Sequence, residues 1–343
     1  MEIIPPYFVP ILVQEETQPG SARREAARLA AMEGMGAEDV GRVSLVVTEA
    51  AKNLVKHGRG GEMLLRGSRV AASSSIDVLA LDKGKGMSDV DGCMRDGFST
   101  AGTSGTGLGA MQRISDLFEV YSVPGEGTVV YCRISSGEPA PLASPFEHMI
   151  SGVVMVPIAG ETKCGDGWAE RHTASHSIFM VVDGLGHGPG AAEAAEEAIA
   201  AFHRIESPNP VDILDEAHHC LRKTRGAALS VAAIDHEARK VRFAGIGNVA
   251  GAIVTASKSQ SMVSHNGIVG HSAARIQDFS YDWPSAATLT MTSDGITSQS
   301  NLMKYPGIAA HSPLVAAALI YRDFSRRRDD ATVLIARERV ARN

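Results

Sequence analysis

Two groups of side chains have the types and spacing that chemistry on phosphate groups requires. The first begins in TEAAKN, where Glu49 and Asn53 are four residues apart. On a helix this spacing puts both side chains on one face. The amide oxygen of Asn53 suits Mg²⁺, and Glu49 is a candidate base that orients or deprotonates an attacking hydroxyl. Taken alone, such a pair is usually only solvated, so the interpretation depends on the segments that follow.

Two glycine-rich segments complete the first group. Asp82-x-Gly84-x-Gly86 follows a strand-like stretch, and residues 102–111, GTSGTGLGAM, lead into a helix. An aspartate at a strand end can accept a hydrogen bond from an exocyclic amino group such as that of adenine. Glycines let the backbone approach phosphates, and the N–H groups of a helix start bind anions. Glycine loops are more often simple turns, but the three segments in this order predict a site for ATP and Mg²⁺.

The second group consists of aspartates at the ends of apolar stretches. They occur in CGDG, VVDGLGHG, TMTSDGI and RRRDDATV, and the candidates are Asp166, Asp183, Asp294 and Asp329. A single Asp-Gly pair commonly marks only a turn. Carboxylates that converge repel one another unless hard cations such as Mg²⁺ or Mn²⁺ lie between them. Two such ions about 4 Å apart activate water for attack on phosphoserine or phosphothreonine. This group therefore predicts a metal-dependent hydrolytic site.

Histidines and basic residues add less to the prediction. His187, in the GHG segment, is either a proton donor or a turn histidine that forms a local hydrogen bond. His218 and His219 lie in a helical pattern and receive no chemical role. No basic residue of these motifs is assigned to phosphate binding.

The elements that must position these residues alternate between helices and largely antiparallel strands, which is the α+β pattern. Helices are predicted, from periodicity, at 21–32, 37–57, about 108–117, 190–202, 211–222 and 313–324. Strands are predicted at 62–66, 76–81, 119–123, 128–134, 152–158, 177–182, 228–234, 240–244, 251–255, 288–292 and 332–336. Between the two halves, a stretch rich in Ser, Gly and Pro predicts a linker at 136–145, which separates domains 1–135 and 146–343.

The composition is that of a soluble globular protein, with 44% hydrophobic and 21% charged residues among 343. The formal net charge of -6 gives no general attraction to nucleic acid or to an anionic membrane surface. The four cysteines have neither zinc-site nor disulfide spacing. No segment has the length of a membrane span, and the start, MEIIPPYFVPILVQ, has no basic leader. We therefore expect an edge strand at the start and a cytoplasmic protein.

The first group resembles the GHKL (Bergerat) ATPase fold, an α/β sandwich, with TEAAKN as its N box and DKGKG and GTSGTGLG as its glycine boxes. No phospho-accepting histidine segment precedes them, and the nearer resemblance is to the serine/threonine kinases of bacterial partner-switching systems, of the stressosome (RsbT) type. It implies that Glu49 is the base, Asn53 the Mg²⁺ ligand and Asp82 the adenine reader. It implies a lid at 99–104 and a nucleotide pocket formed by Gly84, Gly86, Gly105, Thr106, Gly107, Leu108 and Gly109.

The second group, with AGIGNV at 244–249, resembles the SpoIIE-like branch of the PPM phosphatases (RsbX type), whose fold is an αββα sandwich. The resemblance implies that Asp183 bridges two Mg²⁺ or Mn²⁺ ions and that Gly184 contributes its carbonyl. Asp166, Asp294 and Asp329 would complete the ligand set, with Asp330 behind Asp329.

Enzymes of these two types act on STAS-domain proteins, so the resemblance implies a bifunctional regulator that phosphorylates and dephosphorylates a Ser or Thr of a STAS partner. Three alternatives remain for the N-terminal half. It is an anti-sigma kinase with a sigma factor as partner, a non-catalytic switch that ATP gates, or an ATPase of the chaperone or topoisomerase kind. Retention of both Glu49 and Asn53 disfavours the second, and the lack of transducer and clamp domains disfavours the third.

Overall fold

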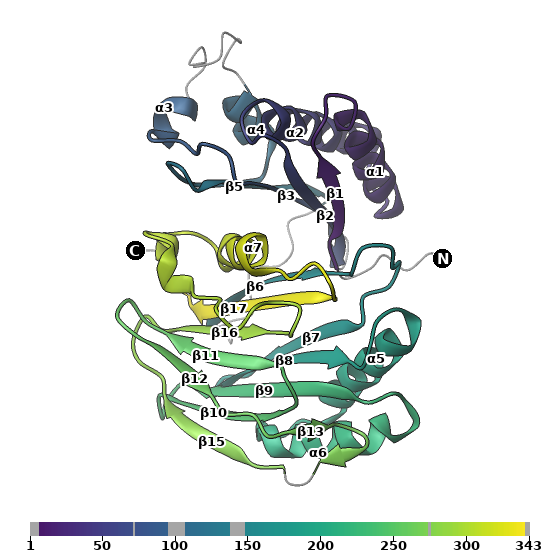
Figure 1. Ribbon diagram of the computed structural model, residues 1–343, viewed down its shortest axis with the longest axis vertical. Helices are drawn as coiled ribbons and strands as arrows, with labels where there is room; N and C mark the ends of the chain where they lie inside the picture. Colours follow the sequence, from purple (N-terminus) through teal and green to yellow (C-terminus); the bar gives the residue numbers. More distant parts are fainter. Residues whose placement is uncertain (1–6, 71–72, 95–106, 138–147, 274–275, 340–343) are drawn as a thin grey trace. The chain divides into compact units, whose positions relative to one another are not determined.

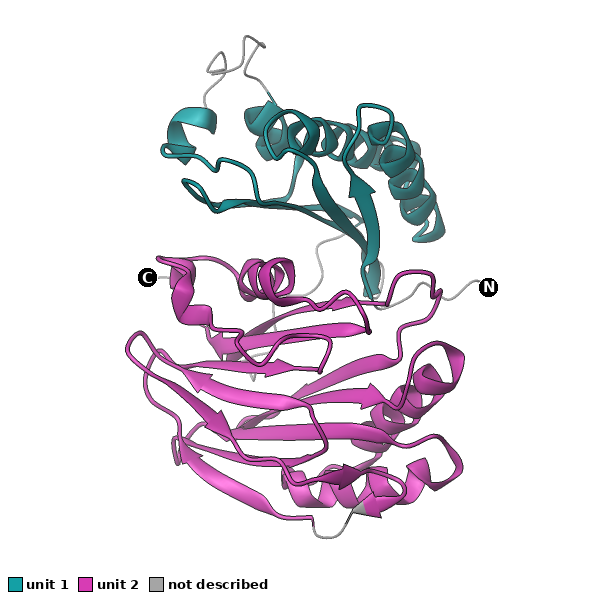
Figure 2. Ribbon diagram, viewed as in Figure 1, with its two compact units in different colours: residues 1–142 teal, residues 143–343 magenta. Residues whose placement is uncertain are grey.

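The chain consists of two compact units, residues 1–142 and 143–343 (Figure 2). The computed structural model describes residues 7–70, 73–94, 107–137, 148–273 and 276–339. The expected linker at 136–145 lies outside the described residues except for 136 and 137. Of these two, Ser136 is the last residue of a strand.

The first unit is one antiparallel sheet of five strands, in the order β1-β2-β3-β5-β4, with helices α1, α2 and α4 packed on one face (Figure 1). Its strands are β1 (Val9–Val13), β2 (Gly61–Val70), β3 (Ser73–Asp82), β4 (Leu117–Val123) and β5 (Gly127–Ser136). Its helices are α1 (Pro19–Met32), α2 (Ala37–Lys56), α3 (Val90–Met94) and α4 (Gly107–Ile114). The strand expected at the start of the chain is β1, and it lies at the edge of the sheet.

Helix α2 is the element that the sequence pattern defines best. Glu38 and Asp39 lie in its first turn, where the helix dipole favours negative charge. Its apolar side chains, among them Val43, Val47 and Leu54, are buried in the core between the helices and the sheet. The same amphipathic pattern leaves the opposite edge of the helix free to carry polar side chains toward α4.

The helix expected to run to residue 117 is shorter in the structure. It ends at Ile114, and Leu117 already begins β4. Asp116 stops the helix because its backbone N–H donates to the carbonyl of Arg133 and its carboxylate accepts from the N–H of Ser135. These bonds start the pairing of β4 with β5, so sheet formation overrides helix propensity here.

The second unit consists of two antiparallel sheets of five strands each, in the orders β15-β10-β9-β8-β7 and β12-β11-β16-β17-β6. The strands are β6 (Met149–Val156), β7 (Asp166–His172), β8 (His176–Gly184), β9 (Ala227–Asp235), β10 (Lys240–Ile246), β11 (Ala250–Val254), β12 (Ser259–Met262), β15 (Asp278–Asp282), β16 (Thr288–Thr292) and β17 (Ala331–Glu338). A small hairpin, β13 (Gly267–Ile268) and β14 (Ser272–Ala273), forms a two-stranded sheet of its own and contacts β9.

Helices cover the outer faces of the two sheets. Helices α5 (Pro189–Arg204) and α6 (Pro210–Cys220) contact the sheet of β7 to β10, and α7 (Pro313–Phe324) contacts β6 and β17 of the other sheet. Contacts of β9 with β11 and of β7 with β17 bring the sheets face to face. Short 3-10 helices follow at Leu221–Lys223, Leu302–Lys304 and Ile308–Ala310. The unit is therefore the αββα sandwich that the sequence predicts.

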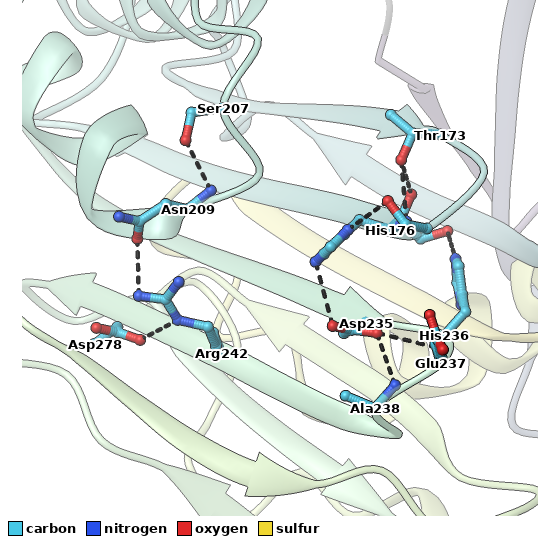
Figure 3. Close-up of polar contacts among 12 residues, drawn as sticks. Thr173, His176, Ser207, Asn209, Asp235, His236, Glu237, Ala238, Arg242 and Asp278 are labelled. Carbon is cyan, nitrogen blue, oxygen red and sulfur yellow. Dashed lines mark hydrogen bonds and ion pairs between the residues drawn. The ribbon is translucent and has the colours of Figure 1, made fainter.

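Polar side chains fix the turns of the second unit at the end shown in Figure 3. Asn209 caps α6 by accepting from the N–H of Val211, and it also accepts from Arg242, which pairs with Asp278 of β15. The β7–β8 and β9–β10 turns meet where His176 lies 3.6 Å from Asp235. These contacts hold the hairpins in register and leave the opposite ends of β7 and β8 to carry aspartates.

Candidate active sites

The first candidate site lies where α2 meets α4. A Cβ placed on Gly107, the first residue of α4, would lie 3.4 Å from Oε2 of Glu49 and 3.7 Å from Oδ1 of Asn53. The carboxylate and the amide, one helical turn apart on α2, therefore both border the start of α4. The N–H groups of a first helical turn have no partner within the helix. Glu49 also accepts a hydrogen bond from Lys52 at 2.7 Å, which leaves its Oε2 atom nearer to Gly107.

Asp82 ends β3 close to the C-terminal end of α2. Its Oδ1 atom accepts a hydrogen bond of 2.8 Å from the backbone N–H of Gly84. A Cβ on Gly84 would lie 2.8 Å from the Cα of Gly58, so this loop packs directly on the end of α2. Gly86 has a φ of +63°, and a Cβ there would overlap the carbonyl of Val123. Both glycines are therefore required by the packing of the loop, which keeps Asp82 near the end of the helix that carries Asn53.

The remaining predicted residues of this site divide into two sets. Gly109 is buried in α4, and Leu108 packs against the core of the unit, so both hold the helix start in place. Gly105, Thr106 and the expected lid at 99–104 lie outside the described residues.

The second candidate site is centred on β7 and β8, two neighbouring strands of one sheet of the second unit. Asp166, the first residue of β7, is the direct partner of Asp183 on β8. Asp166 is 4% exposed, and its Oδ2 atom accepts a hydrogen bond of 2.7 Å from the hydroxyl of Ser293. Ser293 follows β16 and pairs with Thr332 of β17, so it links the two sheets at this point.

The other two aspartates come from the ends of β16 and β17. Asp294 lies two residues beyond β16, and its Oδ2 atom accepts a hydrogen bond of 2.6 Å from the amide of Asn248. Asp329 lies two residues before β17 and accepts from the N–H of Asp330 at 2.9 Å. Because β16 and β17 are paired, both aspartates come to the same end of that sheet.

Mutual repulsion shows in the proton affinities of these carboxylates. Burial raises the pKa of Asp183 well above its usual range, and the charges of Asp166, Asp294 and Asp329 raise it further. Burial also raises the pKa of Asp166, against the effect of its hydrogen bonds with Ser293 and Thr332. The pKa of Asp294 is raised by burial and then by Asp329. Divalent cations would remove this repulsion, and carboxylate oxygens are the ligands that Mg²⁺ and Mn²⁺ prefer.

Among the described residues, no three His, Cys, Asp or Glu side chains come close enough to bind one ion together. Mg²⁺ commonly keeps several water ligands and takes only one or two carboxylates, so a looser set fits it. Gly184 ends β8 directly beside Asp183, and a Cβ there would overlap the carbonyl of Ala191 on α5. The donor chemistry and the excess negative charge therefore fit hydrated divalent cations.

Further residues hold this site: sequence reasoning named Asp330 and His187 without their contacts, and it did not single out Asn248. Asp330 is 2% exposed and accepts from the N–H groups of Ile158 and Gly165, each at 2.7 Å. It thus anchors the segment that leads into Asp166. Asn248 belongs to the AGIGNV motif, but the sequence does not reveal its contact with Asp294, because that contact depends on sheet pairing. His187 lies 2.7 Å from Glu161 through its Nδ1 atom, a contact between two loops.

Comparisons with known proteins agree with both folds. Residues 12–134 match the histidine kinase-like ATPase domain, and residues 173–339 match stage II sporulation protein E (SpoIIE). The serine/threonine-protein kinase RsbT of Bacillus subtilis (strain 168) is 34% identical over 110 residues, which are 32% of this chain and 83% of that protein. The anti-sigma F factor of Thermoanaerobacter sp. (strain X514) is 30% identical over 113 residues, 32% of this chain and 79% of the factor.

The second unit has its own relatives. The phosphoserine phosphatase RsbX of Bacillus subtilis (strain 168) is 27% identical over 103 residues, which are 30% of this chain and 52% of that protein. A solved structure from work on the bacterial stressosome, a modular system adapted to control secondary messenger signaling, is 27% identical with a TM-score of 0.51. It covers 55% of this chain and 99% of its own.

A histidine kinase-like ATPase domain and a SpoIIE-type domain are therefore fused in one chain, as the sequence predicts. Through its first unit the chain belongs to the histidine kinase-like ATPase family that includes RsbT and the anti-sigma F factors. Its second unit is a SpoIIE-type domain. No helix among the described residues combines the length and the apolar character needed to cross a membrane.

Proposed function

We propose that this chain both adds and removes phosphate on a Ser or Thr of a STAS-domain partner. The first unit transfers the phosphoryl group from ATP, and the second unit hydrolyses the resulting phosphoserine or phosphothreonine with two Mg²⁺ or Mn²⁺ ions. The observations that support the proposal are that Glu49 and Asn53 border the start of α4 and that Asp183 lies within the electrostatic influence of Asp166, Asp294 and Asp329. Tethering both activities to one chain raises the local concentration of each for a shared substrate.

The kinase assignment is supported by the position of Glu49. Its carboxylate and the amide of Asn53 both border the first turn of α4, whose N–H groups suit phosphate oxygens. Asn53 would then hold the Mg²⁺ that accompanies ATP, and Asp82 would accept from the adenine amino group. Glu49 would orient the partner's hydroxyl for phosphoryl transfer, which depends mainly on positioning and charge.

The phosphatase assignment is supported by the pairing of Asp166 with Asp183 and by the nearby Asp294 and Asp329. Divalent cations at such a site supply positive charge and activate water near neutral pH. Asp183 and the carbonyl of Gly184 would hold the ions, and Asp166, Asp294 and Asp329 would complete the ligand set. Ser293, Asn248 and Asp330 would keep these groups oriented.

The test is a two-way assay with purified full-length protein, ATP, Mn²⁺ and a STAS-domain protein. Phosphate on the partner is followed by mass spectrometry. We expect Asp183→Asn to accumulate phosphorylated partner and Glu49→Gln to leave it unphosphorylated. With partner that is phosphorylated beforehand, only Glu49→Gln and the wild type should remove phosphate. Phosphorylation by Glu49→Gln at the wild-type rate, or hydrolysis by Asp183→Asn, would contradict the respective assignment.

A second candidate for the first unit is an anti-sigma factor kinase, which the 30% identity to anti-sigma F factor supports. Under this alternative the unit also binds a sigma factor. Affinity capture with the purified chain, in the presence of ATP, should then retain a sigma factor from its own cell extract. Under the stressosome-type assignment only STAS proteins should be retained.

A further inference from the structure

The second unit contains an arginine whose position suggests a role that the motifs do not assign. Arg225 lies in the turn between the 3-10 helix Leu221–Lys223 and β9, the strand that neighbours β8. In the pairing of these strands Ala228 is opposite Asp183 and Ala227 is opposite Gly184. The N–H of Leu185 then donates to the carbonyl of Gly226 at 3.0 Å. Arg225 is therefore held beside the loop that continues from Asp183.

Its guanidinium lies against the glycines of that loop. A Cβ placed on Gly190 would lie 2.7 Å from Nε and 3.1 Å from Nη2 of Arg225. A Cβ placed on Gly186 would lie 3.4 Å from Nη1. Only residues without a side chain let the guanidinium approach the backbone so closely. Gly186 is three residues after Asp183, so the guanidinium lies beside the loop that continues from the aspartate site.

The backbone around Arg225 is fixed from both sides. The hydroxyl of Thr224 donates to the carbonyl of Leu221 at 2.8 Å and accepts from the N–H of Gly226 at 3.0 Å. His271 contacts the carbonyl of Thr224 at 3.1 Å. Gly226 has a φ of +80°, which favours glycine. An arginine on such a fixed turn loses little freedom when it binds an anion.

The hydrogen-bond donors of Arg225 are not used within the described part of the chain. The side chain is exposed, and it forms no ion pair or hydrogen bond with any described residue. Arg171 of the same unit is the contrast, because its guanidinium donates to the carbonyls of Phe202, Ile205 and Ser207 and so has a structural role. A planar guanidinium with unused donors, held beside the loop that follows Asp183, suits a ligand that brings its own negative charge.

We propose that Arg225 binds the phosphoryl oxygens of the phosphorylated side chain and orients it for hydrolysis at the aspartate site. This inference rests on the proposed phosphatase function of the second unit. The fork of N–H donors matches two oxygens of a phosphate monoester dianion. Ionised aspartates can only accept hydrogen bonds, so they cannot donate to the phosphoryl oxygens. Arg326 is a less suitable donor because its charge already acts on Asp294.

The experiment measures hydrolysis of p-nitrophenyl phosphate by the full-length chain with saturating Mn²⁺. For Arg225→Ala we expect KM to rise about 10- to 100-fold, with a smaller change in kcat, because a charge-assisted hydrogen bond is lost. Inhibition by inorganic phosphate should weaken by a similar factor. Arg225→Lys keeps the charge but loses the fork, and should lie between Arg225→Ala and the wild type. Arg222→Ala, an exposed arginine of the adjoining 3-10 helix, is the matched control and should behave as the wild type.

Two results would overturn the inference while the phosphatase function stands. One is an unchanged KM and an unchanged phosphate inhibition in Arg225→Ala. The other is a rise in the Mn²⁺ concentration for half-maximal activity that accounts for the lost activity, since Arg225 would then support the cations and not the phosphoryl group. The proposed phosphatase function itself fails if the wild type does not hydrolyse the substrate, or if Asp183→Asn hydrolyses it equally fast. The inference then fails with it.

Discussion

The two candidate sites are built in different ways. The site of the first unit depends on one helix and on backbone groups: Glu49 and Asn53 follow each other on α2, and glycines shape the rest. The site of the second unit depends on side chains from four strands that come together only through sheet pairing. The first set can be recognised from local spacing, whereas the second requires the register of both sheets.

The sites also differ in their charge. In the first unit Glu49 is paired with Lys52, and the amide of Asn53 is neutral. In the second unit Asp166 pairs with Asp183, and burial and the neighbouring charges raise the pKa values of Asp166, Asp183 and Asp294. A folded unit without cations carries this repulsion as a loss of stability. Cations are therefore expected to contribute to the stability of the second unit and not only to its chemistry.

The largest expected effect sharpens this contrast. Asp183→Asn should lower phosphatase activity at least about 1,000-fold, because it removes the carboxylate that we propose as a ligand of the activating ions. In EDTA the same variant should be more stable than the wild type by about 1–3 kcal/mol, since it removes a buried carboxylate. Excess Mn²⁺ should stabilise the wild type by about 2.7 kcal/mol at 100 times its Kd, and should leave the variant unchanged.

Tryptophan fluorescence during urea unfolding measures this difference within the second unit. The chain has two tryptophans, and both Trp168 and Trp283 belong to that unit. Glu161→Gln, which changes an acidic group without a proposed ligand role, is a useful comparison for stability. A wild type that Mn²⁺ does not stabilise would show that the aspartates do not bind the ion.

The next largest effect concerns the first unit. Glu49→Gln should lower phosphorylation of the partner about 100- to 10,000-fold, the range for loss of a general base. ATP affinity should change by less than about threefold, because Asn53 and the backbone N–H groups remain. Fluorescent-nucleotide binding and phosphotransfer are measured on the same preparation. Glu38→Gln, in the exposed first turn of the same helix, is the control. Equal loss of binding and transfer would indicate that Glu49 only holds the nucleotide pocket together.

The fold could be predicted well where the chain repeats a strong local pattern. Helix α7 and strand β16 have the predicted bounds, and α2 differs by one residue at its end. Strand β7 was not predicted, because its residues, DGWAERH, do not alternate between apolar and polar. Its burial comes from the partner strand β8 and from α5, which no local pattern reveals.

The candidate sites show the same limit. Motif spacing identified Asp166 and Asp183, but only the β7–β8 register shows that they face each other. Asn248 and Arg225 carried no local signal, since each acts on a segment that is distant in sequence. Sequence reasoning therefore found the aspartates of the second site, and the structure was needed to find the donor Asn248 and to suggest Arg225.

A smaller effect is expected at the donor that holds Asp294. Asn248→Ala removes the 2.6 Å hydrogen bond to that carboxylate, so Asp294 loses its orientation while its charge remains. The Mn²⁺ concentration for half-maximal phosphatase activity should rise about 10-fold, as is usual for a partner of a metal ligand. At saturating Mn²⁺ most of the activity should return. Ser261→Ala, exposed on β12, is the control. Full activity at wild-type Mn²⁺ concentrations would mean that the hydrogen bond does not orient a ligand.

The smallest effect tests whether the aspartate site alone makes the second unit sensitive to pH. Burial lowers the pKa of His236 to about 4, and His148, His176 and His172 lower it through their charges against the opposing effect of Glu338. His236 also lies 3.1 Å from the hydroxyl of Ser177 and packs on His148 (Figure 3 shows its place beside Asp235). Since its pKa is about 6.5 when unfolded, the unfolded state binds the proton first as the pH falls.

His236 should therefore contribute a loss of stability as the pH falls from about 6.5 to about 4, and this contribution should be absent above pH 7. Solvent screening of this half-buried group limits the effect to about 1 kcal/mol. His236→Gln cannot take up the proton, so its urea midpoint should fall less between pH 7 and pH 5, with tryptophan fluorescence as the probe. The aspartates are common to both proteins, and the difference between them isolates the histidine. Parallel loss of stability in the two proteins would show that protonation of His236 does not cause it, and the aspartates could not cause it either, because their raised pKa values favour the folded state as the pH falls.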